Sequence, residues 1–209
     1  MTVTISRLYD SYDAASRAVR DLEAAGLAHA NISLVSSNAD NWYGDTRKGT
    51  HKVDRDADGV DDRAEGAAAG SGIGAAVGGT AGLLAGLGIM AIPGIGPVVA
   101  AGWLAATALG AVTGGAAGGI IGALTQAGHS KGDAEIYAEG VRRGGTLLSA
   151  RVLDSERARY EAILDQGAVN IRTRADAYRE SGWQGFDPNA RPYDSDQVRA
   201  EREMYIDRR

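Results

Sequence analysis

Acidic residues with regular spacing stand just before a long uncharged stretch of the chain. The 12-residue window 54–65 has carboxylates at alternate positions, a glycine at the sixth position and a glutamate at the twelfth. This is the EF-hand spacing, in which carboxylates and the backbone carbonyl of the seventh residue bind calcium. The predicted calcium ligands are Asp54, Asp56, Asp58, the carbonyl of Val60, and Glu65.

Two features of the same window favour another interpretation. Asp61 stands where EF-hands usually carry an apolar residue, and the preceding sequence NWYGDTRKGTHKV does not resemble an incoming helix. The alternative is an acidic linker whose carboxylates interact with the positive end of a following helix. Window 54–65 carries six acidic and two basic residues, and so most of the net charge of −5.

The residues that usually carry catalysis are few. The chain has no Cys, which excludes a thiolate nucleophile or metal site. Its histidines, His29, His51 and His129, belong to no HExxH or nucleophile-elbow motif. The net negative charge argues against binding to a phosphate backbone. We therefore expect a non-enzymatic protein with no nucleic-acid partner, and no small-molecule substrate is indicated.

The long uncharged stretch is the main compositional feature of the chain. Residues 66–128 are 63 consecutive positions without Asp, Glu, Lys, Arg or His, and 37 of them are Gly or Ala. Small residues recur every four positions, which places them on one face of a helix. The predicted helix-packing glycines are Gly66, Gly70, Gly74, Gly78, Gly82, Gly86, Gly102, Gly110, Gly114, Gly118 and Gly122.

This pattern predicts a glycine-zipper helical hairpin with helices over 66–92 and 98–127 and a turn over 93–97. Sixteen glycines lie in the two helices, which costs about 16 kcal/mol relative to alanine. Close helix packing or a bilayer must offset that cost. The expected partner is therefore a second copy of the chain, in a homo-oligomer, or membrane lipid, and the sequence leaves both open.

The sequence on either side of the hairpin has the apolar spacing of an α/β domain. Strands are expected over 3–9, 32–35, 146–152 and 169–171, and helices over 15–25, 133–143 and 160–164. Four strands with crossover helices predict an α+β, ferredoxin-like four-stranded sheet interrupted by the inserted hairpin.

The chain therefore divides into five segments. These are a first βαβ half over 1–37, an acidic loop over 38–65, the hairpin over 66–128, a second half over 129–173, and a C-terminal tail over 174–209. The tail is expected to be an extended arm anchored by Trp183, Phe186 and Tyr193, with a short charged helix after Asp194. The N-terminus lacks the pattern of a secretory signal peptide, so we expect a cytoplasmic protein, attached to the inner membrane if residues 66–128 insert there.

Four stretches of the chain together resemble a known family. They are RLYDSYDAASRAVRDLEAAGLAHANISLVSS, VDRDADGVDDRAEGAAAG, GLLAGLG with IPGIGPVVAAG, and YAEGVRRGGTLLSARV with ILDQGAVNI. Over residues 3–173 the chain resembles the bacterial general stress proteins with a heat-induced-stress (YflT-like) domain. The resemblance implies a split α/β domain with a glycine-zipper hairpin and abundance under stress. It implies no catalytic activity or ligand and no site residues.

Overall fold

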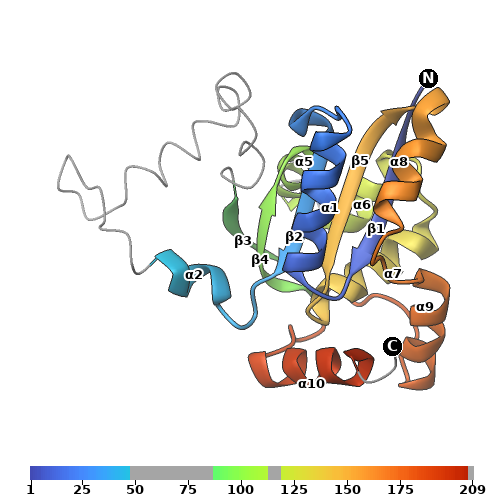
Figure 1. Cartoon of the computed structure of the whole chain (residues 1–209). Helices are drawn as coiled ribbons and strands as arrows, with labels where there is room; N and C mark the ends of the chain where they lie inside the picture. Colours follow the sequence, from blue (N-terminus) through green and yellow to red (C-terminus); the bar gives the residue numbers. More distant parts are fainter. Residues whose placement is uncertain (48–86, 113–118, 207–209) are drawn as a thin grey trace.

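The computed structural model describes residues 1–47, 87–112 and 119–206. Within these ranges the chain forms a five-stranded antiparallel sheet in the order β1-β5-β2-β4-β3, with helices on both faces (Figure 1). The strands are β1 (Thr2–Tyr9), β2 (Ile32–Ser37), β3 (Gly88–Ile92), β4 (Gly96–Ala101) and β5 (Thr146–Leu153). The predicted α+β class is confirmed.

The helices form two layers around this sheet. Helices α1 (Tyr12–Ala24) and α8 (Arg157–Leu164) pack on one face, and α5 (Trp103–Val112), α6 (Gly119–Gln126) and α7 (Lys131–Arg142) pack on the other. The remaining helical elements are α2 (Trp42–Arg47), α9 (Ile171–Glu180), α10 (Ser195–Ile206) and the short turns η1 (His29–Asn31) and η3 (Asp154–Glu156). Helices α9 and α10 lie beyond one end of the sheet (Figure 1).

The first strand, helix and second strand form a split βαβ unit. Strand β5 lies between β1 and β2 and is antiparallel to both, so β1 and β2 run parallel. Ala150 of β5 pairs with Ile5 on one side and with Ile32 on the other. Helix α1 makes the crossover; the Ser11 side chain accepts a hydrogen bond from the N–H of Ala14 at its start.

Alternation along β1 separates two hydrophobic clusters. Ile5 and Tyr9 pack with α1 and α8, whereas Leu8 packs with α7 on the opposite face. This is the period-2 pattern that predicted the strand. The Tyr9 hydroxyl donates a 2.6 Å hydrogen bond to the carbonyl of Leu164, which ties α8 to the sheet.

The predicted strand over 169–171 is wrong. Val169 makes only an isolated bridge with Leu8, and Ile171 begins helix α9. The reason is a local cap, because the Asn170 side chain accepts hydrogen bonds from the N–H groups of Arg172 and Thr173. The apolar residues on either side of Asn170 give this stretch the pattern of a short strand, which hides the cap.

The predicted helices are wrong over residues 88–92 and 98–101, which lie in the antiparallel strands β3 and β4, whereas the predicted turn over 93–97 contains the turn between these strands. Gly94 and Gly96 have φ values of 73° and 101° and let the chain reverse between the two strands. Val98 and Val99 are β-branched and pair with β3, so this part follows strand preferences. The sheet consequently has five strands rather than the four of the predicted ferredoxin-like arrangement.

The small residues that follow β4 are used inside the domain. Helices α5 and α6 pack against each other, and their Leu104, Ile120 and Leu124 are buried in the core. Gly110 lies in α5 and Gly122 in α6, so the predicted helical structure holds at these two positions. Among the residues that the structure describes, no helix is long and apolar enough to cross a bilayer.

Gly102 is a turn residue rather than a helix-packing residue. Its φ is +86°, and a Cβ at this position would collide with the carbonyl oxygen of Ile32 in β2. The positive φ is needed because the chain turns sharply from β4 into α5. The Ser33 hydroxyl donates to the Ala101 carbonyl and accepts from the N–H of Leu104 on either side of this turn.

Substitution Gly102→Ala tests this close approach. We expect it to lower the free energy of unfolding by at least about 3 kcal/mol, because backbone strain adds to a collision with a central strand. Gly26→Ala is the matched control; its φ is +94° but no atom lies within 4 Å of the added Cβ. It should cost only about 1 to 2 kcal/mol in a denaturant titration. Equal losses for the two variants would contradict this account.

Candidate functional site

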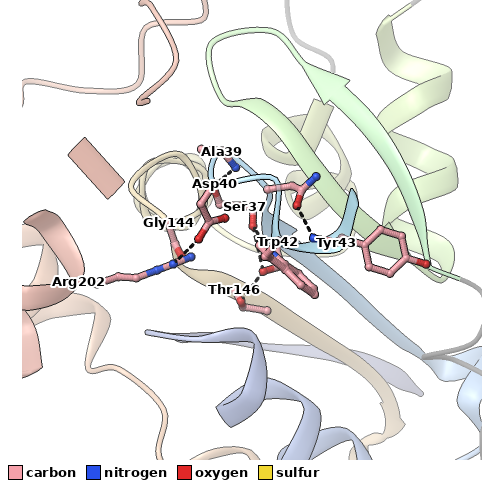
Figure 2. Close-up of polar contacts among 10 residues, drawn as sticks. Ser37, Ala39, Asp40, Trp42, Tyr43, Gly144, Thr146 and Arg202 are labelled. Carbon is pink, nitrogen blue, oxygen red and sulfur yellow. Dashed lines mark hydrogen bonds and ion pairs between the residues drawn. The ribbon is translucent and has the colours of Figure 1, made fainter. Parts of the chain in front are cut away.

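The chain leaves the sheet at the end of β2, where a set of polar contacts fixes its path (Figure 2). The backbone N–H of Asn38 donates to the carbonyl of Pro97 at 2.9 Å, and the Asn38 side-chain oxygen accepts from the N–H of Tyr43 at 3.1 Å. The indole N–H of Trp42 donates to the carbonyl of Ser37 at 2.9 Å. Helix α2 is therefore anchored to the strand that precedes it.

Helix α2 also contacts the residue at which the described chain resumes. The Tyr43 hydroxyl donates a 2.9 Å hydrogen bond to the carbonyl of Leu87, the residue before β3. Leu87 is buried in the core, and the Trp42 ring packs 4.5 Å from the ring of Tyr12. The described chain stops at Arg47, the end of α2, and resumes at Leu87, so Tyr43 connects the two described segments on either side of residues 48–86. We call the contact region of residues 38–43 and Leu87 the root.

The C-terminal arm, residues 174–206, crosses the turn between β3 and β4. A Cβ at Gly94 would lie 2.7 Å from Cα of Pro188, and one at Gly96 would lie 2.7 Å from Cβ of Pro192. The two glycines therefore leave the space into which the arm packs. The same two glycines therefore allow the turn between β3 and β4 and make room for the arm.

The predicted aromatic anchors of the arm all make contacts. The ring of Trp183 packs edge-on against Tyr178 at 6.1 Å, and Phe186 packs against the core on the α5–α7 face. The guanidinium of Arg142 lies 4.8 Å from the centre of the Tyr193 ring. The predicted charged helix is also confirmed as α10, whose start is capped by the side chain of Asp194.

A buried ion cluster joins the arm to α7. The Nε of Arg143 donates to Glu139 at 2.6 Å, and its Nη1 donates to Glu201 of α10 at 2.7 Å. Glu139 is fully buried, and Arg143 and Glu201 are 8% and 7% exposed. Arg142 lies 3.3 Å from the second oxygen of Glu139, so two arginines face two glutamates. A buried charge of this kind depends on its partners.

Burial affects the protonation of the cluster in opposite directions on its two sides. Burial raises the pKa of the Glu201 carboxyl, and the charge of Arg143 opposes that effect. Burial by itself would lower the pKa of Arg143, but the hydrogen bond with Glu139 and the charge of Glu201 raise it above its ordinary value. Arg143 is therefore a permanent cation at the centre of the cluster.

One more arginine connects the arm to the root. The Nη1 of Arg202 donates to Asp40 at 2.8 Å, and its Nη2 donates to the carbonyl of Gly144 at 3.0 Å (Figure 2). Asp40 lies between β2 and α2, and Gly144 lies between α7 and β5. The last helix of the chain thus contacts the loop through which residues 44–86 are attached.

The predicted calcium ligands and most of the zipper glycines fall outside the residues that the structure describes. These are Asp54, Asp56, Asp58, Val60, Glu65, Gly66, Gly70, Gly74, Gly78, Gly82, Gly86, Gly114 and Gly118. The other three, Gly102, Gly110 and Gly122, belong to the packed domain. Within the described ranges, no group of three His, Asp or Glu side chains is arranged to hold a metal ion.

Local sequence patterns do not reveal the residues that organise the root and the arm. Glu139 and Glu201 are 62 positions apart, and Asp40 and Arg202 are 162 apart, so no local spacing connects them. A signal did exist in α7, where two adjacent arginines follow an apolar helix face that contains a glutamate. These two arginines indicate an unusual end to the helix, but they do not identify Glu201 as the partner.

Comparison with known proteins leaves the chain without a relative to define its role. No family model matches the sequence. No curated protein matches it, and no solved structure matches its fold. The resemblance to general stress proteins therefore stays a prediction, and the function must be argued from this chain itself.

Replacing Arg143 with methionine tests the importance of the ion cluster. Arg143→Met leaves two buried glutamates without their common partner, and we expect a loss of about 3 to 5 kcal/mol in the free energy of unfolding. Arg199→Met is the matched control, because Arg199 lies on the exposed side of α10, the helix that carries Glu201. It should change the free energy of unfolding by less than about 0.5 kcal/mol. Chemical denaturation and limited proteolysis of the arm are the measurements. An Arg143→Met protein as stable as the control would show that the arm is held by its aromatic contacts alone.

Proposed function

We propose that this chain is a non-enzymatic general stress protein that assembles with copies of itself through residues 66–86. Six glycines recur at four-residue spacing in this run, from Gly66 to Gly86. On a helix they would form one smooth face on which a second helix can approach closely. The folded domain would then serve as the base that carries this face.

The observation that carries the proposal is the tie at the root. The Tyr43 hydroxyl of α2 donates to the carbonyl of Leu87, so the described chain before residues 48–86 contacts the described chain after them. The described residues of the second small-residue stretch pack inside the domain in α5 and α6. We therefore assign association between copies to the run 66–86.

The same tie favours association between copies over insertion into a membrane. A segment that starts and ends at one point crosses a bilayer twice or not at all. Two crossings need about 40 predominantly apolar residues. The uncharged part of residues 48–86 is 21 residues long, and only four of these are Leu, Ile or Val. Lipid is therefore the less favoured partner.

The non-enzymatic part of the proposal has support in how the described polar groups are used. His129 makes a 2.9 Å hydrogen bond with the Ser6 hydroxyl, which also contacts Ser149 at 2.7 Å. Burial lowers the pKa of His129. These groups hold β1, β5 and the segment before α7 together, a structural use that requires no substrate.

Sedimentation velocity of the full chain tests the assembly. The wild-type protein should form concentration-dependent oligomers, and Gly78→Leu should weaken them at least about tenfold because a large side chain separates the helices. Ala76→Leu is the matched control, since position 76 falls on the opposite side of the same helix. A wild-type monomer at all concentrations would overturn the proposal. Flotation of the protein with lipid vesicles would instead favour the membrane partner.

Calcium binding by window 54–65 is a second candidate function, favoured by its EF-hand spacing. In this version the chain is a calcium-responsive scaffold, and the metal orders the loop that connects the root with the run 66–86. Only Val60 in the ligand set contributes through its backbone, so the carboxylates supply the charge that binds the ion.

Calorimetric titration with calcium tests this second candidate. Binding should be saturable at or below about 1 mM calcium, and Asp58→Ala should abolish it by removing a ligand. Asp61→Ala is the matched control because the eighth position of the pattern contributes no ligand. The absence of any heat with the wild-type chain would exclude calcium, and equal losses in both variants would indicate attraction by charge alone.

A further inference from the structure

We propose that a cavity beside the free edge of β1 binds a small molecule that carries an oxyanion, such as a phosphate ester or a carboxylate. The cavity has a volume of about 460 Å³, which is in the range of small-molecule sites. It lies between β1, α7 and the chain that joins α8 to α9. The N–H of Val169 fixes that chain to the carbonyl of Leu8 at 2.7 Å.

The first element of the site is an arginine held in place on the edge strand. The Nη1 of Arg7 donates to the carbonyl of Ser6 at 2.9 Å, and the hydroxyl of Tyr137 donates to the same carbonyl at 2.7 Å. Both side chains line the cavity. A guanidinium has five N–H donors, and Arg7 uses two of them in hydrogen bonds to the residues that the structure describes.

The second element is a carboxylate that already occupies this arginine. Asp165 accepts a 2.6 Å hydrogen bond from the Nε of Arg7, yet the Asp165 side chain is 59% exposed. Only the Arg7 side of this pair is covered, at 25% exposure, so solvent screens the Asp165 carboxylate and a competing anion can replace it. Asp165 therefore shows, within the chain, the chemistry that Arg7 accepts: a planar oxyanion at the cavity wall.

A second arginine makes the cavity favourable for an added anion. Arg172, in the first turn of α9, lines the cavity and forms no ion pair with any residue in the described ranges. Arg7, Arg172 and Asp165 together leave a positive charge. A phosphate or carboxylate that contacts both arginines would gain two charge-assisted partners where Asp165 has one.

Apolar residues in the lining of the cavity favour a ligand with an apolar part. Val169, Ile171 and Tyr137 line the cavity together with the two arginines. Burial raises the pKa of Tyr137 to about 12, so its hydroxyl stays protonated and does not add negative charge. The combination of cationic and apolar lining residues is typical of a site for a small organic anion rather than a bare ion.

Three probes separate the possible sources of the oxyanion in a titration of the full chain followed by NMR or calorimetry. They are inorganic phosphate, phenyl phosphate and phenylacetate. Phenyl phosphate should bind more tightly than inorganic phosphate, because only the ester also contacts the apolar lining residues. Tighter binding of phenylacetate than of phenyl phosphate would assign the site to carboxylates. No saturable binding of any probe at about 10 mM would overturn the proposal.

Substitutions at the cavity distinguish a site from general attraction by charge. Arg7→Gln should weaken phenyl phosphate binding at least about tenfold, and Arg172→Gln about threefold. Asp165→Asn should strengthen it about threefold or more, because the competing carboxylate is removed. Arg199→Gln, on the distant and exposed side of α10, is the matched control and should leave affinity unchanged.

The result for Asp165→Asn is decisive even if Arg7→Gln fails to fold. A role limited to structure predicts unchanged or weaker binding in Asp165→Asn, and that outcome would overturn the proposal. Equal weakening by Arg199→Gln and Arg172→Gln would do the same. The cavity lies in the described domain and does not involve residues 66–86, so these results are independent of the assembly.

Discussion

The buried contact between Arg143 and two glutamates is the constraint on which the rest of the structure depends. Glu139 lies in the last turn of α7 and Arg143 directly follows this helix, four residues later. Glu201 comes from α10. Charges taken out of water must find partners, and the arm supplies one of them, Glu201, to Arg143. Once α10 is there, Arg202 can reach Asp40, and residues 187–192 can pack over the turn between β3 and β4. The arm thus packs on and supports β3 and β4, the two strands that extend the sheet beyond β2.

Those two strands explain how the domain accommodates residues 48–86. A split βαβ unit with β5 at its centre forms the base of the sheet, and β4 and β3 extend it beyond β2. The extension buries Leu87 and Ile92 and gives the returning chain a fixed place. Three contacts hold α2, β3 and the turn after β3 in place: the Tyr43 hydroxyl on Leu87, the Asp40–Arg202 pair, and the arm against the turn.

The sequence predicted the parts of this architecture that depend on local periodicity. The alternation in β1 and the helical spacing in α1 and α7 appear in the structure because each element buries one face. It failed at 88–92 and 98–101, where strands form although small residues at helical spacing lie on both sides, and at Asn170, where a capping side chain outweighs two apolar neighbours. The cluster at Arg143 and the cavity at Arg7 could not be found in this way. Arg7 and Asp165 are 158 positions apart, and only the folded chain brings them together.

The bond between Tyr43 and Leu87 also has a consequence for how this protein can vary. Because Tyr43 contacts Leu87, the chain between them starts and ends at residues that the domain already holds together. The entropic cost of closing such a loop grows only with the logarithm of its length, by about 0.6 kcal/mol for each doubling. Insertions, deletions or a different sequence between residues 48 and 86, after α2, would therefore change the domain's stability little. The stability of the domain thus places little constraint on the sequence between residues 48 and 86.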